Sequence, residues 1–200
     1  LANANDPKDI AEVPKLQDAT KDEQPGGPGR FETPVWDKAS QDKVRGALLT
    51  LGSTLPSLRG AFGPRGKIDP THHLIGAASA WGGNPKTEAD YVSVTPRQND
   101  GKTAYRFNVK DVPVDGFWSV IVYDEKGYIP KNDRNVYSFN NLTAKKDPDG
   151  SVTIQFGGDP AKAANCIPIV PGRSYLVRLY RPRKEILEGK WKFPEAQPVQ

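Results

Sequence analysis

The sequence predicts a mainly β fold: an antiparallel β-sandwich of jelly-roll type, with one or two N-terminal helices packed on it and an extended N-terminal arm. Two observations carry this prediction. The 200 residues include 19 glycines and 19 prolines, a share that is typical of many strands joined by turns. From about residue 90 onward, apolar side chains recur at every second position, which is the period of a half-buried strand.

Seven segments show the period of two, and clusters of Asp, Asn, Gly and Pro separate them at intervals of roughly 10–15 residues. The expected strands are Tyr91–Thr95, Ala104–Val109, Phe117–Tyr123, Val136–Phe139, Ser151–Phe156, Cys166–Val170 and Ser174–Tyr180. This spacing and turn chemistry favour a sandwich or jelly roll over a helical fold.

A helix is expected over residues 37–51. Asp37 can cap its N-terminus, and Val44, Leu48 and Leu51 recur at helical spacing. Residues 182–187 have the length of one further short helix.

A second helix near the N-terminus is expected over residues 69–81. Asp69 can cap it, Pro70 can occupy the first helical position, and Gly82 follows its end. The small residues that begin at Gly76 would allow another segment to pack closely on this helix.

The composition predicts an extended Pro/Gly-rich arm over residues 1–36. Residues 37–200 are expected to form a single β-sandwich domain. Residues 1–30 carry a net charge of −2, and the rest of the chain carries +6. The arm has few apolar side chains to offset the entropy of ordering. We expect it to be ordered only where it lies on its own domain or on a partner, which makes a homo-oligomer or an envelope-protein partner a hypothesis.

The composition excludes several classes of protein. A net charge of +4 without a basic stripe argues against a nucleic-acid partner. No run of about 18 apolar residues is present, so no membrane span is expected. The start Leu1–Pro7 is typical of a chain from which a secretion signal was removed, and we expect a periplasmic or secreted location. The single Cys166 cannot form an internal disulfide and is expected to be a small buried side chain.

Motifs of known enzymes are missing. The sequence has no G-x-S-x-G, Walker or G-x-G-x-x-G pattern, so no cofactor is expected, and no zinc spacing, so no metal site is expected. Catalytic candidates are limited to His72, His73 and Asp124, because histidine titrates near neutral pH and a carboxylate can orient it. The alternative is that the two histidines have structural roles.

A polar stretch follows the strand expected at residues 117–123. It supplies the candidates for binding a polar small molecule or a glycan, namely Tyr128, Arg134, Tyr137, Asn140 and Asn141. The alternative is that these groups satisfy backbone atoms in a long connection.

Arg178 falls in the middle of the last expected strand. A guanidinium there needs a carboxylate or several carbonyls as partners. Asp124 and Asp115 are candidates for a structural ion pair with it, and binding of an anionic ligand is the alternative.

Six blocks of residues resemble a bacterial domain-of-unknown-function family, numbered 1214. They are Gly60–Pro64, His73–Pro85, Val114–Asp124, Gly127–Asn132, Tyr137–Ala144 and Tyr175–Arg183, and together they cover roughly residues 58–198. The resemblance implies a β-sandwich of jelly-roll type and export to the cell envelope. It supplies no catalytic residues.

Members of that family often follow a second uncharacterised domain, numbered 1254. Only about 60 residues precede the resemblance here, as expected for a stand-alone or shortened version.

Three functions remain open from sequence. The first is an exported cell-envelope binding or assembly module without catalysis. The second is an envelope hydrolase or lyase that acts on a glycan or ester through a His/Asp pair. The third is an accessory subunit of a larger envelope complex, which differs from the first only in having a dedicated partner.

Overall fold

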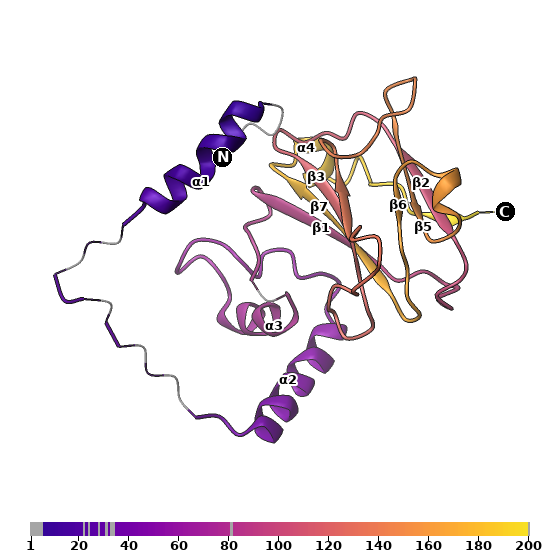
Figure 1. The fold of residues 1–200 in the computed structure, drawn as a ribbon. Helices are drawn as coiled ribbons and strands as arrows, with labels where there is room; N and C mark the ends of the chain where they lie inside the picture. Colours follow the sequence, from indigo (N-terminus) through magenta and orange to yellow (C-terminus); the bar gives the residue numbers. More distant parts are fainter. Residues whose placement is uncertain are drawn as a thin grey trace. The chain divides into compact units, whose positions relative to one another are not determined.

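The computed structural model describes residues 6–21, 23, 25–27, 29, 30, 32, 35–80 and 82–199. Two four-stranded sheets dominate it (Figure 1). The first has the order β1 (Ala89–Val94), β7 (Ser174–Tyr180), β3 (Trp118–Tyr123), β4 (Ser138–Asn140). The second has the order β6 (Cys166–Ile167), β5 (Val152–Phe156), β2 (Tyr105–Val109), β8 (Gln197–Pro198). Every pairing is antiparallel except that of β5 with β6.

One hydrophobic core joins the two sheets. On β7, Tyr175, Val177 and Leu179 are buried and alternate with half-buried residues. Val177 pairs with Val120 of β3, and both belong to the same buried cluster as Ile154 of the second sheet. The period of two therefore identified which face of β7 and β2 is buried, whereas β3 and β5 have buried residues on both faces.

Each of the seven expected strands is present, with ends that differ by a few residues. The segment Ser174–Tyr180 matches β7 at both ends, whereas β6 is limited to Cys166 and Ile167. The sequence pattern missed β8, because two exposed residues show no alternation. Cys166 is buried and its thiol faces the Gly157 carbonyl at 3.4 Å, as a small core residue is expected to do.

The two expected helices that precede the strands are also present. Helix α2 (Lys38–Ser53) begins after Asp37, whose carboxylate accepts bonds from two backbone N–H groups of the first turn. Helix α3 (Pro70–Ala80) begins after Asp69, which accepts a bond from the His72 N–H at 2.7 Å. A Cβ atom on Gly76 would lie 2.6 Å from the Ala61 Cβ, so the small residues of α3 do permit close packing.

Helix α1 (Pro7–Ala19) corrects the expectation of an extended arm over those residues. Asp6 caps this helix by accepting a bond from Lys8 N–H at 2.9 Å, and Pro7 stands at its first position. The Asp-Pro pair thus repeats the start of α3, and it outweighs the low apolar content. Ile10 and Leu16 of α1 remain 49% and 68% exposed.

The chain divides into two units, residues 1–44 and residues 45–200. Both sheets belong to the larger unit, together with α3, a 3-10 turn (Pro160–Lys162) and the short α4 (Lys184–Leu187). Within the described ranges, no helix is long and apolar enough to cross a membrane.

The shared core makes a direct prediction about stability. Ile154 is fully buried in β5, whereas Ile129 is 50% exposed in the connection after β3. We expect Ile154→Ala to lower the free energy of unfolding by about 2–5 kcal/mol, because it leaves a cavity between the sheets. The matched Ile129→Ala change is expected to stay within about 0.5 kcal/mol. Urea denaturation measures both, and equal effects would contradict the shared core.

Candidate binding pocket

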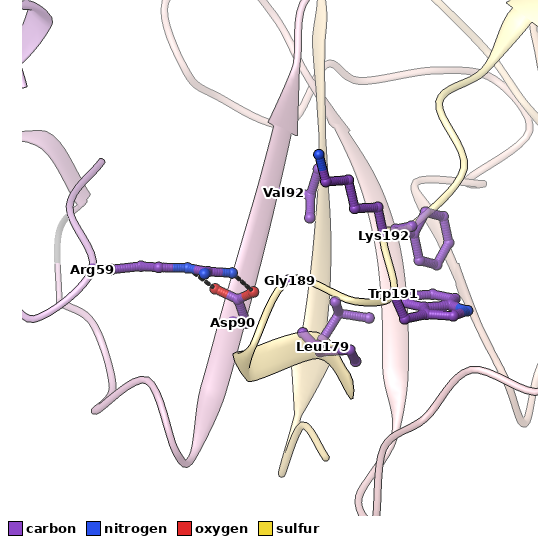
Figure 2. A pocket seen from close by; sticks show the side chains of 9 residues that line it. Arg59, Asp90, Val92, Leu179, Gly189, Trp191 and Lys192 are labelled. Carbon is purple, nitrogen blue, oxygen red and sulfur yellow. Dashed lines mark hydrogen bonds and ion pairs between the residues drawn. The ribbon is translucent and has the colours of Figure 1, made fainter. Parts of the chain in front are cut away.

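A pocket of about 290 Å³ lies against the core-facing side of β1 and β7, beside α4 and the segment that follows it (Figure 2). Apolar side chains form most of its lining, and three charged side chains complete it. The apolar residues are Val92, Leu179, Ile186, Trp191 and Phe193; the charged ones are Arg59, Asp90 and Lys192.

The strand register explains how a carboxylate reaches this place. Asp90 pairs with Leu179, and Val92 pairs with Val177, so Asp90 shares the core-facing side of β1. Because β1 is the edge strand of its sheet, side chains there can meet other segments beside the core. Asp90 is 4% exposed, so its carboxylate needs a partner from within the chain.

Arg59 is that partner. Its Nε donates to Oδ1 of Asp90 at 3.1 Å, and its Nη2 donates to Oδ2, which makes the pair bidentate. The Arg59 side chain extends from the segment between α2 and α3 to the edge of β1, as Figure 2 shows, and 47% of it is exposed. The pair therefore has one desolvated partner and one that faces water.

The C-terminal segment forms the opposite wall. Trp191 donates its backbone N–H to the Glu185 carbonyl at 2.8 Å, which fixes the segment to α4. The Trp191 and Phe193 rings pack edge to face at 6.0 Å, and Phe193 in turn contacts Trp118 of the core. Lys192 is exposed between these two aromatic residues. With Asp90 balanced by Arg59, the ammonium group gives the pocket a net positive charge.

The histidines predicted as catalytic candidates both lie on α3. The Nδ1 atom of His73 is 2.8 Å from the Ala61 carbonyl, and its ring packs edge to face on Phe62. His72 Nε2 is buried and has no partner among the described residues. The hydrogen bonds of the described chain join neither histidine to Asp124.

Asp124 stabilises a turn at the end of β3. Its Oδ1 accepts bonds from the backbone N–H groups of Lys126 and Tyr128, at 2.9 and 2.8 Å. The Tyr128 side chain is 60% exposed. The acid predicted as the partner of a catalytic histidine thus holds backbone instead.

Two of the residues predicted to bind a glycan, Asn140 and Asn141, accept hydrogen bonds from backbone N–H groups. Asn140 accepts bonds from the backbone of Leu142 and Thr143, both at 2.8 Å. Asn141 accepts from the Trp118 N–H at 3.2 Å. These contacts agree with the structural alternative for the polar stretch.

Two further candidates from this stretch also bind protein groups. Arg134 donates to the Cys166 carbonyl at 3.3 Å, and the Tyr137 hydroxyl donates to Asn135 at 3.1 Å. None of the residues predicted for ligand binding appears in the lining of the pocket.

Arg178 does not have the partner predicted for it. Its Nη2 donates to the Tyr123 hydroxyl at 2.6 Å. Asp115 instead pairs with Arg183 at 2.7 Å, and that bond is the main reason why the pKa of Arg183 is raised. The backbone register places Arg178 opposite Ser119 and Tyr91, on the outer side of its sheet, where no buried ion pair is required.

Sequence reasoning missed Asp90, Arg59 and Trp191. A signal for Asp90 was present, because alternation along Tyr91–Thr95 assigns Asp90 to the face of Val92. Nothing local connects it to Arg59, which lies 31 residues earlier. In the described part of the chain, no group of three His, Cys, Asp or Glu residues could hold a metal ion.

Comparison with known proteins now identifies part of the chain. Residues 89–184 match the model of a family described as protein of unknown function (DUF1214). The chain carries a DUF1214 domain. The resemblance inferred from the sequence is confirmed over these residues, which run from the start of β1 to the start of α4. The DUF1214 segment includes Asp90, Val92 and Leu179 of the pocket, whereas Arg59 precedes it and Trp191 follows it.

Two solved structures are similar to this chain. The VPA0106 protein from Vibrio parahaemolyticus shares 26% sequence identity at a TM-score of 0.62, over 82% of this chain and 44% of that one. An uncharacterized protein from Burkholderia cenocepacia shares 16% identity at a TM-score of 0.34, over 80% of this chain and 47% of that one. This chain thus spans less than half of the length of either protein. No curated protein matches it.

The Asp90–Arg59 pair leads to a prediction about stability. Arg59→Met leaves the buried Asp90 carboxylate without its partner. We expect it to lower the free energy of unfolding by about 1–3 kcal/mol. The loss is smaller than for a fully buried pair, because the Arg59 side chain is about half exposed. The double variant Arg59→Met/Asp90→Asn should recover part of this loss, because the charge is then absent. Chemical denaturation of wild type, Arg59→Met, Asp90→Asn and the double variant gives the coupling energy between the two side chains.

The pair of Arg183 and Asp115 is a matched control, because both side chains are 53% exposed. Arg183→Met is expected to destabilise the fold less than Arg59→Met, because water screens a pair that is exposed on both sides. An equal or larger loss than for Arg59→Met would contradict the structural role of the buried pair.

Proposed function

We propose that this protein is an exported cell-envelope module that binds, without catalysis, a small molecule with an apolar body and one acidic group. The observation that carries the proposal is the lining of the pocket beside β1 and β7. Five apolar side chains there surround a carboxylate already neutralised by Arg59, and Lys192 supplies the remaining positive charge.

This chemistry suits an amphipathic anion better than a neutral sugar. Trp191 and Phe193 offer apolar area that binds through exclusion of water. Lys192 lies in the same lining and can pair with a carboxylate or sulfonate of the ligand. A glycan would need several donors and acceptors, and the polar groups expected to supply them bind backbone elsewhere.

The fold assigned to this module is a sandwich of jelly-roll type. Support comes from the common core of the two sheets and from a chain path that changes sheet repeatedly: from β1 to β2, β2 to β3, β4 to β5, β6 to β7 and β7 to β8. The proposed location in the envelope rests on the family resemblance. Fractionation of the native host cells tests this location. Recovery of the protein in the cytoplasmic fraction would contradict it.

The hydrolase or lyase alternative has no observation in its favour. Asp124 is engaged in a turn and His73 with the Ala61 carbonyl. Neither lines the pocket. These positions support the proposal of a module that binds its ligand without transforming it.

The proposal predicts binding of 8-anilinonaphthalene-1-sulfonate, which has an apolar body and one negative group. We expect Trp191→Ala to weaken its binding about tenfold or more through lost apolar contact. Lys192→Gln should weaken it roughly two- to fivefold through the lost charge. Fluorescence titration measures both, and octanoate is expected to displace the probe whereas maltose is not.

The control for charge is Lys190→Gln. Lys190 is two residues away and exposed, pairs with Glu188 at 2.6 Å and does not line the pocket. Unchanged affinity in this control, with a loss in Lys192→Gln, supports the pocket. Equal affinity of wild type and Trp191→Ala would refute it, as would displacement by maltose in place of octanoate.

An assembly role is the second candidate, and exposed apolar side chains near the N-terminus support it. Leu16 of α1 is 68% exposed, Trp36 is 66% exposed and Val44 of α2 is 60% exposed. Such side chains are common where a protein meets a partner. The segment up to residue 36 is the first candidate for such a contact.

Deletion of residues 1–36 tests this role. If the segment holds copies or a partner together, light scattering should show a multimer for the full chain and a monomer for the shortened one. The deletion should leave binding of the sulfonate probe unchanged, because the pocket lies wholly within residues 59–193. A monomeric full chain that co-purifies with no other protein would exclude the assembly role.

A further inference from the structure

Arg173 is the largest side chain that is fully buried, with 0% of the residue exposed. It directly precedes β7. Its Nε, Nη1 and Nη2 atoms are all buried, and none has a hydrogen-bond partner among the residues that the structure describes. A guanidinium remains charged inside a protein and carries five N–H donors, so such a site demands an acceptor.

The surroundings compensate only part of this demand. The guanidinium lies over the Tyr105 ring, 5.4 Å from its centre, and cation–π attraction stabilises it there. Burial is nevertheless the largest influence on the pKa of Arg173 and lowers it. An aromatic ring face cannot accept hydrogen bonds from all five N–H groups, so donors of the guanidinium remain unsatisfied.

The carboxylate that acts on the pKa of Arg173 is that of Asp100, and its oxygens are engaged elsewhere. Its attraction raises the pKa of Arg173, against the effect of burial. Its oxygens accept bonds from the backbone of Lys102 and Thr103 and from the Thr103 hydroxyl, at 2.7–2.9 Å. These bonds lower the pKa of Asp100 to about 2 and hold the carboxylate in its own turn.

The segment around Asp100 packs tightly on the turn that precedes β7. Asn99 donates from Nδ2 to the Arg173 carbonyl at 2.8 Å, and Gly172 N–H donates to the Asn99 carbonyl at 3.1 Å. A Cβ on Gly101 would lie 2.6 Å from Pro171, so the segment has no room to move closer. The Oδ1 atom of Asn99 is also buried and has no hydrogen-bond partner in the described part of the chain.

We propose that Arg173 binds a small inorganic anion of about the size of chloride inside the protein. Water alone could accept bonds from the guanidinium, but it would add no negative charge next to the buried cation. An anion supplies both acceptor and charge, and complete burial restricts it to a small ion. A water beside it can donate to Asn99 Oδ1, which an anion cannot do. This site is separate from the pocket at Asp90, because the two share no residue.

Anion-dependent thermal stability tests the site. Wild type, Arg173→Met and the exposed Arg65→Met are dialysed into sodium chloride or into sodium gluconate of equal ionic strength, since gluconate is too large for the site. Any non-specific effect of a salt on the Tm should be the same for all three proteins, so it cancels when they are compared. An ion at about 100 times its Kd is expected to raise the Tm of wild type and Arg65→Met by roughly 5–11 °C beyond that effect. Arg173→Met should lose this difference.

A crystal structure of wild type grown in bromide tests the same site without a substitution, so it decides the matter even if Arg173→Met does not fold. We expect an anomalous bromide peak within hydrogen-bond distance of the Arg173 nitrogens. Water at that position with no anomalous peak, or an equal salt response in Arg173→Met and wild type, would overturn the proposal.

Discussion

The packing of β7 between β1 and β3 is the constraint on which the rest of the structure depends. Because it is an inner strand, its alternate residues Tyr175, Val177 and Leu179 must all enter the common core. That register then decides the face of every neighbouring residue, including Asp90 opposite Leu179. A shift by one residue would expose the apolar set and bury Arg178 in its place. The position of the pocket is thus a consequence of how this strand pairs.

A charged side chain is buried near each end of β7, and the two charges are compensated in different ways. Near the last residues of the strand, Asp90 is buried and receives a bidentate partner from the chain itself. Arg173, just before the first residue, is buried more completely and has the Tyr105 ring against it, but its nitrogens have no hydrogen-bond partner among the described residues. Leu179 follows Arg173 by six positions of extended chain, a span of about 20 Å. The two charged sites can therefore act independently.

Strand positions could be predicted from the sequence because they depend on local alternation, and β7 is the clearest example. Helix α1 was missed because the low apolar content of the segment was given more weight than its capping residues. Asp6 and Pro7 are typical of the start of a helix. The pocket could not be predicted, because Arg59 and Asp90 meet only through the fold. Asn140 and Asn141 looked available for a ligand, yet their oxygens hold backbone atoms. Polar side chains in long connections often have this use.

This distinction decides how function is assigned to such a chain. An exposed polar cluster tells little when each of its members already has a partner. The informative groups are those whose demand the chain leaves unmet: the ammonium of Lys192 beside an apolar lining, and the guanidinium of Arg173 beneath the segment of Asp100. The first faces solvent and can exchange a ligand readily, so it suits recognition. The second is enclosed, so what it binds becomes part of the folded state and contributes to stability at the point where β7 enters the core.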